Sequence, residues 1–161
     1  MRLRPISAVL SAVAASLIAM ACGGSSSGTG TSSTARAEAP TRAVFIKRGD
    51  AICEQTDKKQ ETIISAYLRK HPKAKANKSG QEGIVLVALP PIQVEAEELN
   101  RLQPPNGDES EIKVIVSRIE EAVNESKADP SKLIGTLSRG PFTAAGKLAA
   151  KYGFKACAFP L

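Results

Sequence analysis

The chain has 161 residues, a hydrophobic content of 42% and a formal net charge of +6. Trp is absent and aromatic residues make up only 4% of the chain, so we expect a core of aliphatic side chains. The basic excess is mild and does not indicate a nucleic-acid partner, and the length suits one domain after an N-terminal segment.

The first 21 residues have the layout of a signal peptide. Arg2 and Arg4 precede an apolar run over residues 6–20, and small residues lie just before Cys22. The run is shorter than the roughly 20 apolar residues of a transmembrane helix. We therefore predict an exported protein, and export makes a nucleic-acid partner still less expected.

The end of this leader, Leu17-Ile18-Ala19-Met20-Ala21-Cys22, resembles the lipobox of bacterial lipoproteins. The resemblance implies that a diacylglyceryl group is attached to the Cys22 thiol, that cleavage makes Cys22 the N-terminus, and that the protein is anchored to the outer face of the cell membrane. Two acyl chains hold a protein firmly to a bilayer, whereas one binds only marginally. Ala19 stands where Leu is commonest in the family, which leaves open an ordinary cleavage after Ala21 or Ala19 and a secreted protein.

Residues 22–40 are predicted to be a tether. Positions 23–34 are almost entirely Gly, Ser and Thr, a composition that cannot bury enough apolar surface to fold. A coil of this length spans about 23 Å, so it would hold residues 41–161, the predicted helical domain, just above the membrane.

The first predicted helix runs from about Thr41 to Arg69. It is expected to end at His71, because Pro72 disfavours helical geometry in the residue before it. Its expected inward positions, which recur at helical spacing, are Phe45, Gly49, Ile52, Thr56, Ile63 and Tyr67.

Four acidic residues also recur at helical spacing along this helix: Asp50, Glu54, Asp57 and Glu61. They admit two interpretations, a cation site or a solvated helix face. We favour the solvated face. We predict no metal site, because the chain has a single histidine and no close pair of cysteines.

A basic segment follows the first helix, with five cations and no acid between positions 62 and 81. The five are Arg69, Lys70, Lys73, Lys75 and Lys78. They could contact anionic lipid head groups or an anionic envelope polymer, at about 1 kcal/mol per cation near an anionic surface; the alternative is a solubilising loop. The lone histidine, His71, lies among these cations rather than beside a nucleophile, so we assign it no catalytic role.

The second helix is predicted to start at a capping box, with Ser79 as N-cap and Glu82 at N3. Pro90-Pro91 should kink or break it, because proline lacks an amide donor. Asp108 together with Glu111 is predicted to cap a third helix, with inward residues Ile112, Ile115, Val116, Ile119, Ala122 and Val123.

Two further helical segments are expected near the C-terminus. Asp129-Pro130 should begin a short helix through Leu137. Apolar residues from Phe142 to Tyr152 indicate a last helix, closed by Gly153. The predicted fold is therefore all-α, a small bundle of about four to five helices with one helix broken at the proline pair.

The three cysteines are Cys22, Cys53 and Cys157. If Cys22 carries lipid, only one pairing remains, and export favours its oxidation. We therefore predict a Cys53–Cys157 disulfide, which would close a loop worth up to about 4.7 kcal/mol in the chain-entropy model. Two buried free thiols are the alternative.

The segments around these cysteines, residues 45–53 (FIKRGDAIC) and 152–157 (YGFKAC), are similar to those of a loose group of small actinobacterial lipoproteins. The group shares a cysteine in the first helix and a near-terminal Tyr-Gly-x-x-x-Cys ending. It implies no activity.

No catalytic motif is recognisable in the chain. A nucleophilic triad would need a base beside Ser or Cys, and no phosphate-binding or dinucleotide fingerprint occurs. We predict a monomeric, cofactor-free, non-enzymatic module of the cell envelope that binds a protein or an anionic polymer. Two alternatives stay open: a small hydrolase with paired carboxylates, and a carrier that holds a lipid tail in its aliphatic core.

Overall fold

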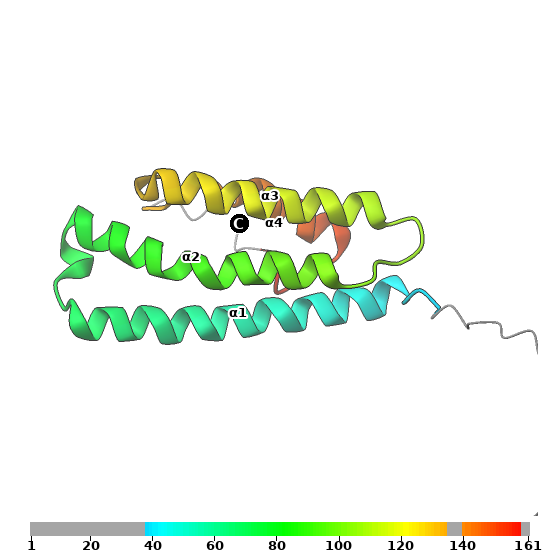
Figure 1. Ribbon diagram of the computed structural model, residues 1–161, viewed down its shortest axis with the longest axis horizontal. Helices are drawn as coiled ribbons and strands as arrows, with labels where there is room; N and C mark the ends of the chain where they lie inside the picture. Colours follow the sequence, from blue (N-terminus) through cyan, green and yellow to red (C-terminus); the bar gives the residue numbers. More distant parts are fainter. Residues whose placement is uncertain (1–37, 135–139, 159–161) are drawn as a thin grey trace, which may run out of the picture. The chain divides into compact units, whose positions relative to one another are not determined.

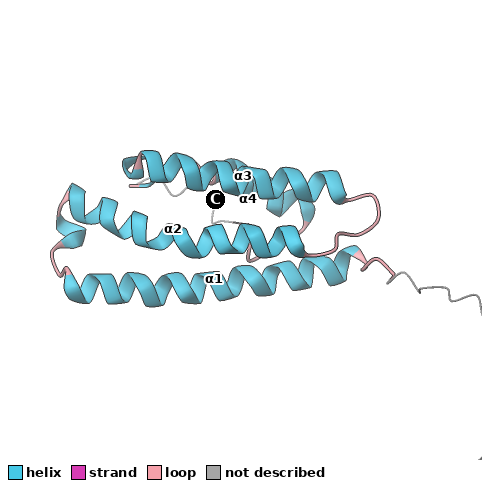
Figure 2. Ribbon diagram, in the orientation of Figure 1, coloured by secondary structure: helices cyan, strands magenta, loops and turns pink. Residues whose placement is uncertain are grey.

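The computed structural model describes residues 38–134 and 140–158. Four helices form the fold: α1 (Arg42–Lys70), α2 (Lys78–Arg101), α3 (Glu109–Ala128) and α4 (Thr143–Tyr152). Two 3-10 turns, η1 (Ala74–Ala76) and η2 (Pro130–Leu133), lie in the connections. The described residues contain no strand (Figure 2), which confirms the all-α prediction.

Helix α1 begins and ends where the sequence predicts. The Thr41 side chain accepts a hydrogen bond from the Val44 amide at 3.4 Å, and His71 terminates the helix before Pro72. Phe45, Gly49, Cys53 and Thr56 are the buried residues of the helix. Ile63, also predicted to face inward, is 38% exposed, and among the described helices α1 packs chiefly against α2.

The predicted start of α2 is wrong by two residues. Asn77, not Ser79, is the N-cap, and its side chain accepts the Gly80 amide at 2.8 Å. The Asn77 amide also donates to the Lys73 carbonyl at 2.9 Å, which ties the cap to η1. Asn and Ser have similar preferences for the N-cap position, and here the two hydrogen bonds of Asn77 place the start of the helix at this residue.

The expected break at Pro90-Pro91 is not observed. Helix α2 continues through both prolines to Arg101, and Figure 1 shows it bent rather than interrupted. Gln60 of α1 donates its side-chain amide to the Ala88 carbonyl at 3.0 Å. This contact holds α2 against α1 in the turn where proline removes regular backbone donors.

The predicted inward set of α3 is confirmed, since all six of its residues are buried. Asp108 precedes the helix but forms no side-chain cap. It accepts the Tyr152 hydroxyl at 2.8 Å instead, because the aromatic residue of α4 competes for its carboxylate. The segment after Asp129 is the short turn η2, which ends at Leu133, while Leu137 lies outside the described residues.

The helices assemble as neighbours in chain order (Figure 1): α1 runs beside α2, α2 beside α3, and α4 packs on α3. Gly153 closes α4 with a positive φ of 114°, which glycine adopts without strain. The chain then returns to α1, where Phe154 and Tyr152 contact Phe45 at ring-centroid distances of 6.0 Å.

A Cys53–Cys157 disulfide joins the middle of α1 to this C-terminal segment, with a Cα–Cα distance of 5.2 Å. The predicted pairing is therefore confirmed. The largest fully buried side chains around it are mostly aliphatic, including Leu89, Leu99, Ile115 and Ile119. The expectation of a mainly aliphatic core is met, with Phe45, Phe142, Tyr152 and Phe154 as its aromatic part.

Candidate functional site

The five predicted cations gather around the connection between α1 and α2. Arg69 and Lys70 occupy the last turn of α1, Lys73 and Lys75 lie at η1, and Lys78 is the first residue of α2. All five side chains are exposed. We call this group of five residues the basic end.

Short-range hydrogen bonds shape the connection that carries the basic end. The Ala74 amide donates to the His71 carbonyl at 2.9 Å, and the Ala76 amide donates to the Lys73 carbonyl at 3.0 Å. Ala74 is buried against Gly80, where a side chain would overlap the Ala74 backbone. The local backbone is therefore fixed tightly, while the lysine side chains project from it.

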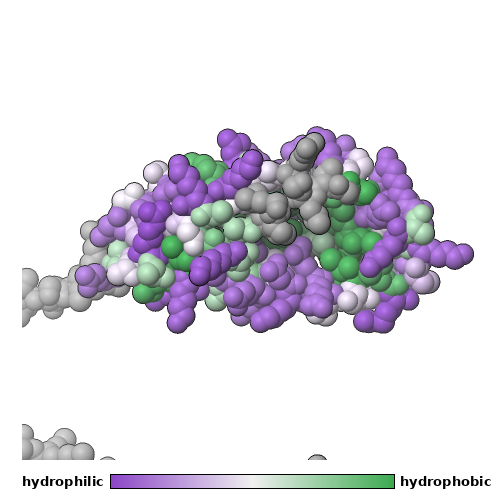
Figure 3. Space-filling model, turned by 180° about the vertical axis from the view of Figure 1, so that it is seen from behind, coloured by the Kyte–Doolittle hydropathy of each residue, from purple (hydrophilic) through white to green (hydrophobic). Residues whose placement is uncertain are grey.

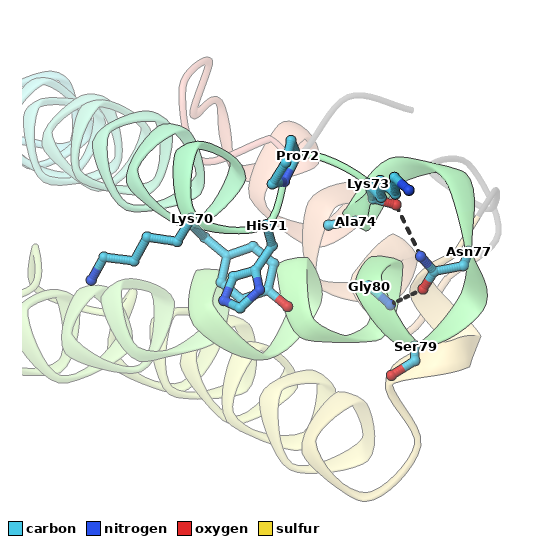
Figure 4. Close-up of a pocket in the computed structure, with 9 residues that line it drawn as sticks. Lys70, His71, Pro72, Lys73, Ala74, Asn77, Ser79 and Gly80 are labelled. Carbon is cyan, nitrogen blue, oxygen red and sulfur yellow. Dashed lines mark hydrogen bonds between the residues drawn. The ribbon is translucent and has the colours of Figure 1, made fainter.

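A pocket of about 560 Å³ lies at this connection (Figure 4). Lys70 and Lys73 line it, together with the stacked rings of Tyr67 and His71, whose centroids are 4.4 Å apart. Figure 4 shows the Lys70 and Lys73 side chains extending in different directions. These two cations therefore do not converge on one point, which suits an extended anionic partner better than a single small anion.

A favourable interaction with the helix dipole explains only some of the five cations of the basic end. Cations in the last turn of a helix, such as Arg69 and Lys70, interact favourably with its dipole. Lys78 lies at the opposite, N-terminal end of α2, where a cation is unfavourable. Its ion pair with Glu82 is 3.7 Å long and the Lys78 side chain is 76% exposed, so the pair contributes little. The carbonyl groups of Lys73 and Lys75 accept hydrogen bonds from Asn77 and Gln81, whereas the charged side chains of the two lysines extend from an exposed surface.

Apolar surface accompanies the basic end. Ile63 and Leu86, in the halves of α1 and α2 that flank the connection, are 38% and 45% exposed. Figure 3 shows a hydrophobic area toward the end of the bundle that carries this connection, surrounded by hydrophilic residues.

The four acidic residues that recur along α1 have different environments in the structure. Glu54, Asp57 and Glu61 are exposed, as a solvated face requires. Partial burial, followed by the nearby Glu54 carboxylate, raises the pKa of Asp57. Asp50 has a different role, because its Oδ1 accepts the amides of Lys155 and Ala156 at 2.9 and 2.8 Å. Within the described residues, no group of three or more His, Cys, Asp or Glu side chains could hold a metal ion.

A second polar cluster joins α1, α3 and α4. The Arg42 guanidinium lies 4.0 Å from the centre of the Tyr152 ring and pairs with Glu111 at 3.3 Å. Burial, followed by the hydrogen bond to Asp108, raises the pKa of the Tyr152 hydroxyl. These contacts connect three helices and act as a structural clamp.

The sequence analysis overlooked one buried acid. Glu95 of α2 is only 3% exposed and has a side-chain oxygen with no hydrogen-bond partner. A signal was present, because position 95 is three residues after Ile92 and four before Leu99, two apolar residues that recur at helical spacing and are buried in α2. Among the described residues it is the one buried carboxyl group.

No protein-family model matches this chain, and no curated protein or solved structure is significantly similar to it. None of the described helices combines the length and apolarity needed to cross a membrane. Cys22, the predicted signal peptide and the tether up to residue 37 lie outside the described residues.

Proposed function

We propose that this protein is an exported lipoprotein, anchored through Cys22, whose basic end binds anionic material of the cell envelope. The observation that carries the proposal is the clustering of five exposed cations around one connection, in a stretch of sequence without acids. The leader and its cysteine support the anchored location. The mature chain would then be a binding module without catalytic activity.

The length of α1 supports this arrangement. The helix has 29 residues and is therefore about 42 Å long, and the tether joins its N-terminal end. The basic end lies at the other end of the helix. A flexible tether of about 23 Å would let the bundle either project this surface from the membrane or lie down upon the head groups.

The energetics favour an extended partner. Each cation near an anionic surface contributes about 1 kcal/mol, so several must act together for useful affinity. The attraction is also screened within about 10 Å at 0.1 M salt. We therefore expect binding that is moderate, sensitive to salt and tolerant of the exact anion.

The binding test uses charge reversal with a matched control. The variant Lys70→Glu, Lys73→Glu, Lys75→Glu should lose at least about 100-fold in affinity for phosphatidylglycerol-containing vesicles or for long-chain polyphosphate. The control reverses three exposed lysines elsewhere, Lys59, Lys113 and Lys147, with the same change in net charge.

Co-sedimentation with anionic vesicles, neutral vesicles and polyphosphate separates the outcomes. Loss confined to the basic-end variant supports the proposal, and comparison of vesicles with polyphosphate identifies membrane or polymer as the partner. An equal loss of affinity in both variants would mean that binding depends only on net charge, and it would contradict a defined binding surface.

The anchor is tested separately. Wild-type protein expressed in a lipoprotein-processing bacterium should incorporate a clickable fatty acid and stay with the membrane. Cys22→Ser should incorporate none and appear in the medium. Equal labelling of both forms would contradict the lipobox assignment and leave the binding test unaffected.

The hydrolase alternative receives less support. Its paired carboxylates would have to reach a polymer substrate, and Glu95, the one buried carboxyl of the described residues, is enclosed in the core with 3% exposure. Among the acids of α1, Asp50 is half-buried and its carboxylate already accepts backbone amides of the C-terminal segment.

A further inference from the structure

Glu95 occupies an unusual position for a carboxyl group. It is 3% exposed, and its Oε1 atom has no hydrogen-bond partner. The Thr56 side chain of α1 hydrogen-bonds to the carboxyl group, and Thr56 is itself 4% exposed. A buried carboxylate is tolerated only when it is paired with a counter-charge or is protonated.

Within residues 38–134 and 140–158, no cation acts on Glu95 as a counter-charge. Its charged neighbours are Asp57 of α1 and Glu98 of α2, both acidic. Helices α3 and α4 contribute buried apolar side chains to the core, and the Ser126 hydroxyl donates to the Ala122 carbonyl and the Tyr152 hydroxyl to Asp108. The buried Thr143 Oγ1 of α4 has no hydrogen-bond partner, but like the other two hydroxyl groups it supplies no positive charge. We therefore infer that the Glu95 carboxyl group is protonated when it is buried at this site.

Glu95 also lies about one helical turn after Pro90-Pro91. The prolines cannot donate backbone hydrogen bonds, so the ladder of α2 is weakened just before the buried acid. The part of α2 that precedes the prolines is held to α1 by the bond from Gln60 to the Ala88 carbonyl, 3.0 Å long. A weakened helix and a buried acid thus share one interface between α1 and α2.

We propose that the proton on Glu95 controls the packing of α2 against α1. With the proton bound, Glu95 stays beside Thr56 and the two helices remain in contact. When the proton is lost, the charged side chain moves toward solvent and α2 opens at Pro90-Pro91. The proposal does not depend on anionic-ligand binding or on the lipid anchor.

The expected pH range follows from the environment. Burial, followed by the electrostatic effect of Asp57 and Glu98 and opposed by the Thr56 hydrogen bond, raises the pKa of Glu95 from 4.5 to about 7. The folded state therefore binds this proton more tightly than the unfolded chain. The stabilisation is complete below pH 4.5, falls as the pH rises, and is lost above about pH 7.

Hydrogen exchange of the full chain between pH 5 and pH 9 tests the proposal. After correction for intrinsic exchange rates, the opening equilibrium of amides in residues 84–95 should increase about tenfold per pH unit from pH 5 to about pH 7 and level off above pH 7. Glu95→Gln, which keeps the shape and removes the titration, should show no such increase. Glu97→Gln, an exposed position on the same helix, should behave as the wild type.

Two results would overturn the proposal: opening of residues 84–95 that does not depend on pH in the wild type, or the same dependence in Glu95→Gln. If Glu95→Gln does not fold, the proposal is tested instead by a carbon-13 titration of the Glu95 carboxyl group in the wild-type protein. A midpoint near pH 7 supports the proposal, and a midpoint near 4.5, the ordinary value, refutes it.

Discussion

Single residues with distant partners hold the C-terminal segment on the bundle. Asp50 is the clearest case, because one of its oxygens accepts the amides of Lys155, Ala156 and, at 3.4 Å, Cys157. In the sequence it is one member of an acidic stripe and cannot be told from its neighbours. Spacing along a helix predicts which residues share a face, but it carries no information about a segment more than 100 positions away.

Asp50→Ala should lower the free energy of unfolding by about 1.5–3 kcal/mol, because backbone amides would lose a charged acceptor. Urea denaturation of the variant measures the change. Glu54→Ala, one turn further along the same face and exposed, is the control and should change stability by less than about 0.5 kcal/mol. Equal effects of the two substitutions would mean that the Asp50 contacts do not stabilise the fold.

At the scale of elements, the sequence predicted where the helices lie, but it did not predict the N-cap of α2 or the continuity of α2 through its prolines. The periodic apolar set of α3 was sufficient to predict its buried face, since that pattern depends only on local geometry. The cap of α2 was mispredicted because Asn77 and Ser79 are comparable caps, and a contact with η1 decides between them. The continuity of α2 through Pro90-Pro91 depends on its packing against α1, which the sequence of α2 does not contain.

Two helical glycines should respond oppositely to substitution by alanine. A side chain at Gly49 would overlap the Phe154 ring and approach Leu99 at 3.3 Å, both inside the core. Gly49→Ala should therefore lower the free energy of unfolding by about 1–2 kcal/mol. The overlap in the core outweighs the preference of alanine over glycine in a helix, which is about 1 kcal/mol. At Gly83 the obstacle is the hydroxyl end of the half-buried Tyr67, which can rotate away.

Gly83→Ala should consequently be neutral or stabilising by up to about 1 kcal/mol. Thermal and urea unfolding of the two variants, each under the same solution conditions, measure the change in stability at each site. A stabilised Gly49→Ala protein would show that Phe154 does not pack tightly against α1.

At the scale of the whole molecule, the sequence was sufficient to predict an all-α bundle, its disulfide and the residues of the basic end. It was not sufficient to predict the distribution of those cations in space. Lys70 and Lys73 line one pocket while Arg69, Lys75 and Lys78 lie outside it, an arrangement set by the turn around Ala74 and Gly80. Glu95 was overlooked because its burial results from the joint packing of α1 and α2.

The disulfide constrains the whole molecule most strongly. It links positions separated by 104 residues, and α4 makes its helix contacts mainly with α3, so the bridge adds a direct covalent link from the C-terminal segment to α1. Restricting so long a loop in the unfolded chain should stabilise the fold by about 2–4 kcal/mol. The Phe45–Tyr152–Phe154 ring contacts and the Asp50 hydrogen bonds would remain without it.

We therefore expect the variant Cys53→Ala, Cys157→Ala to keep its helical circular dichroism and to lose about 2–4 kcal/mol of stability in urea. Cys157→Ala alone should lose nearly as much, because one thiol cannot form the bridge. In a Cys22→Ser background purified without reductant, maleimide labelling should detect no free thiol by mass. Two labelled thiols in the folded protein would contradict the bridge, and the C-terminal segment would then depend on Asp50 and the aromatic contacts for its position on α1.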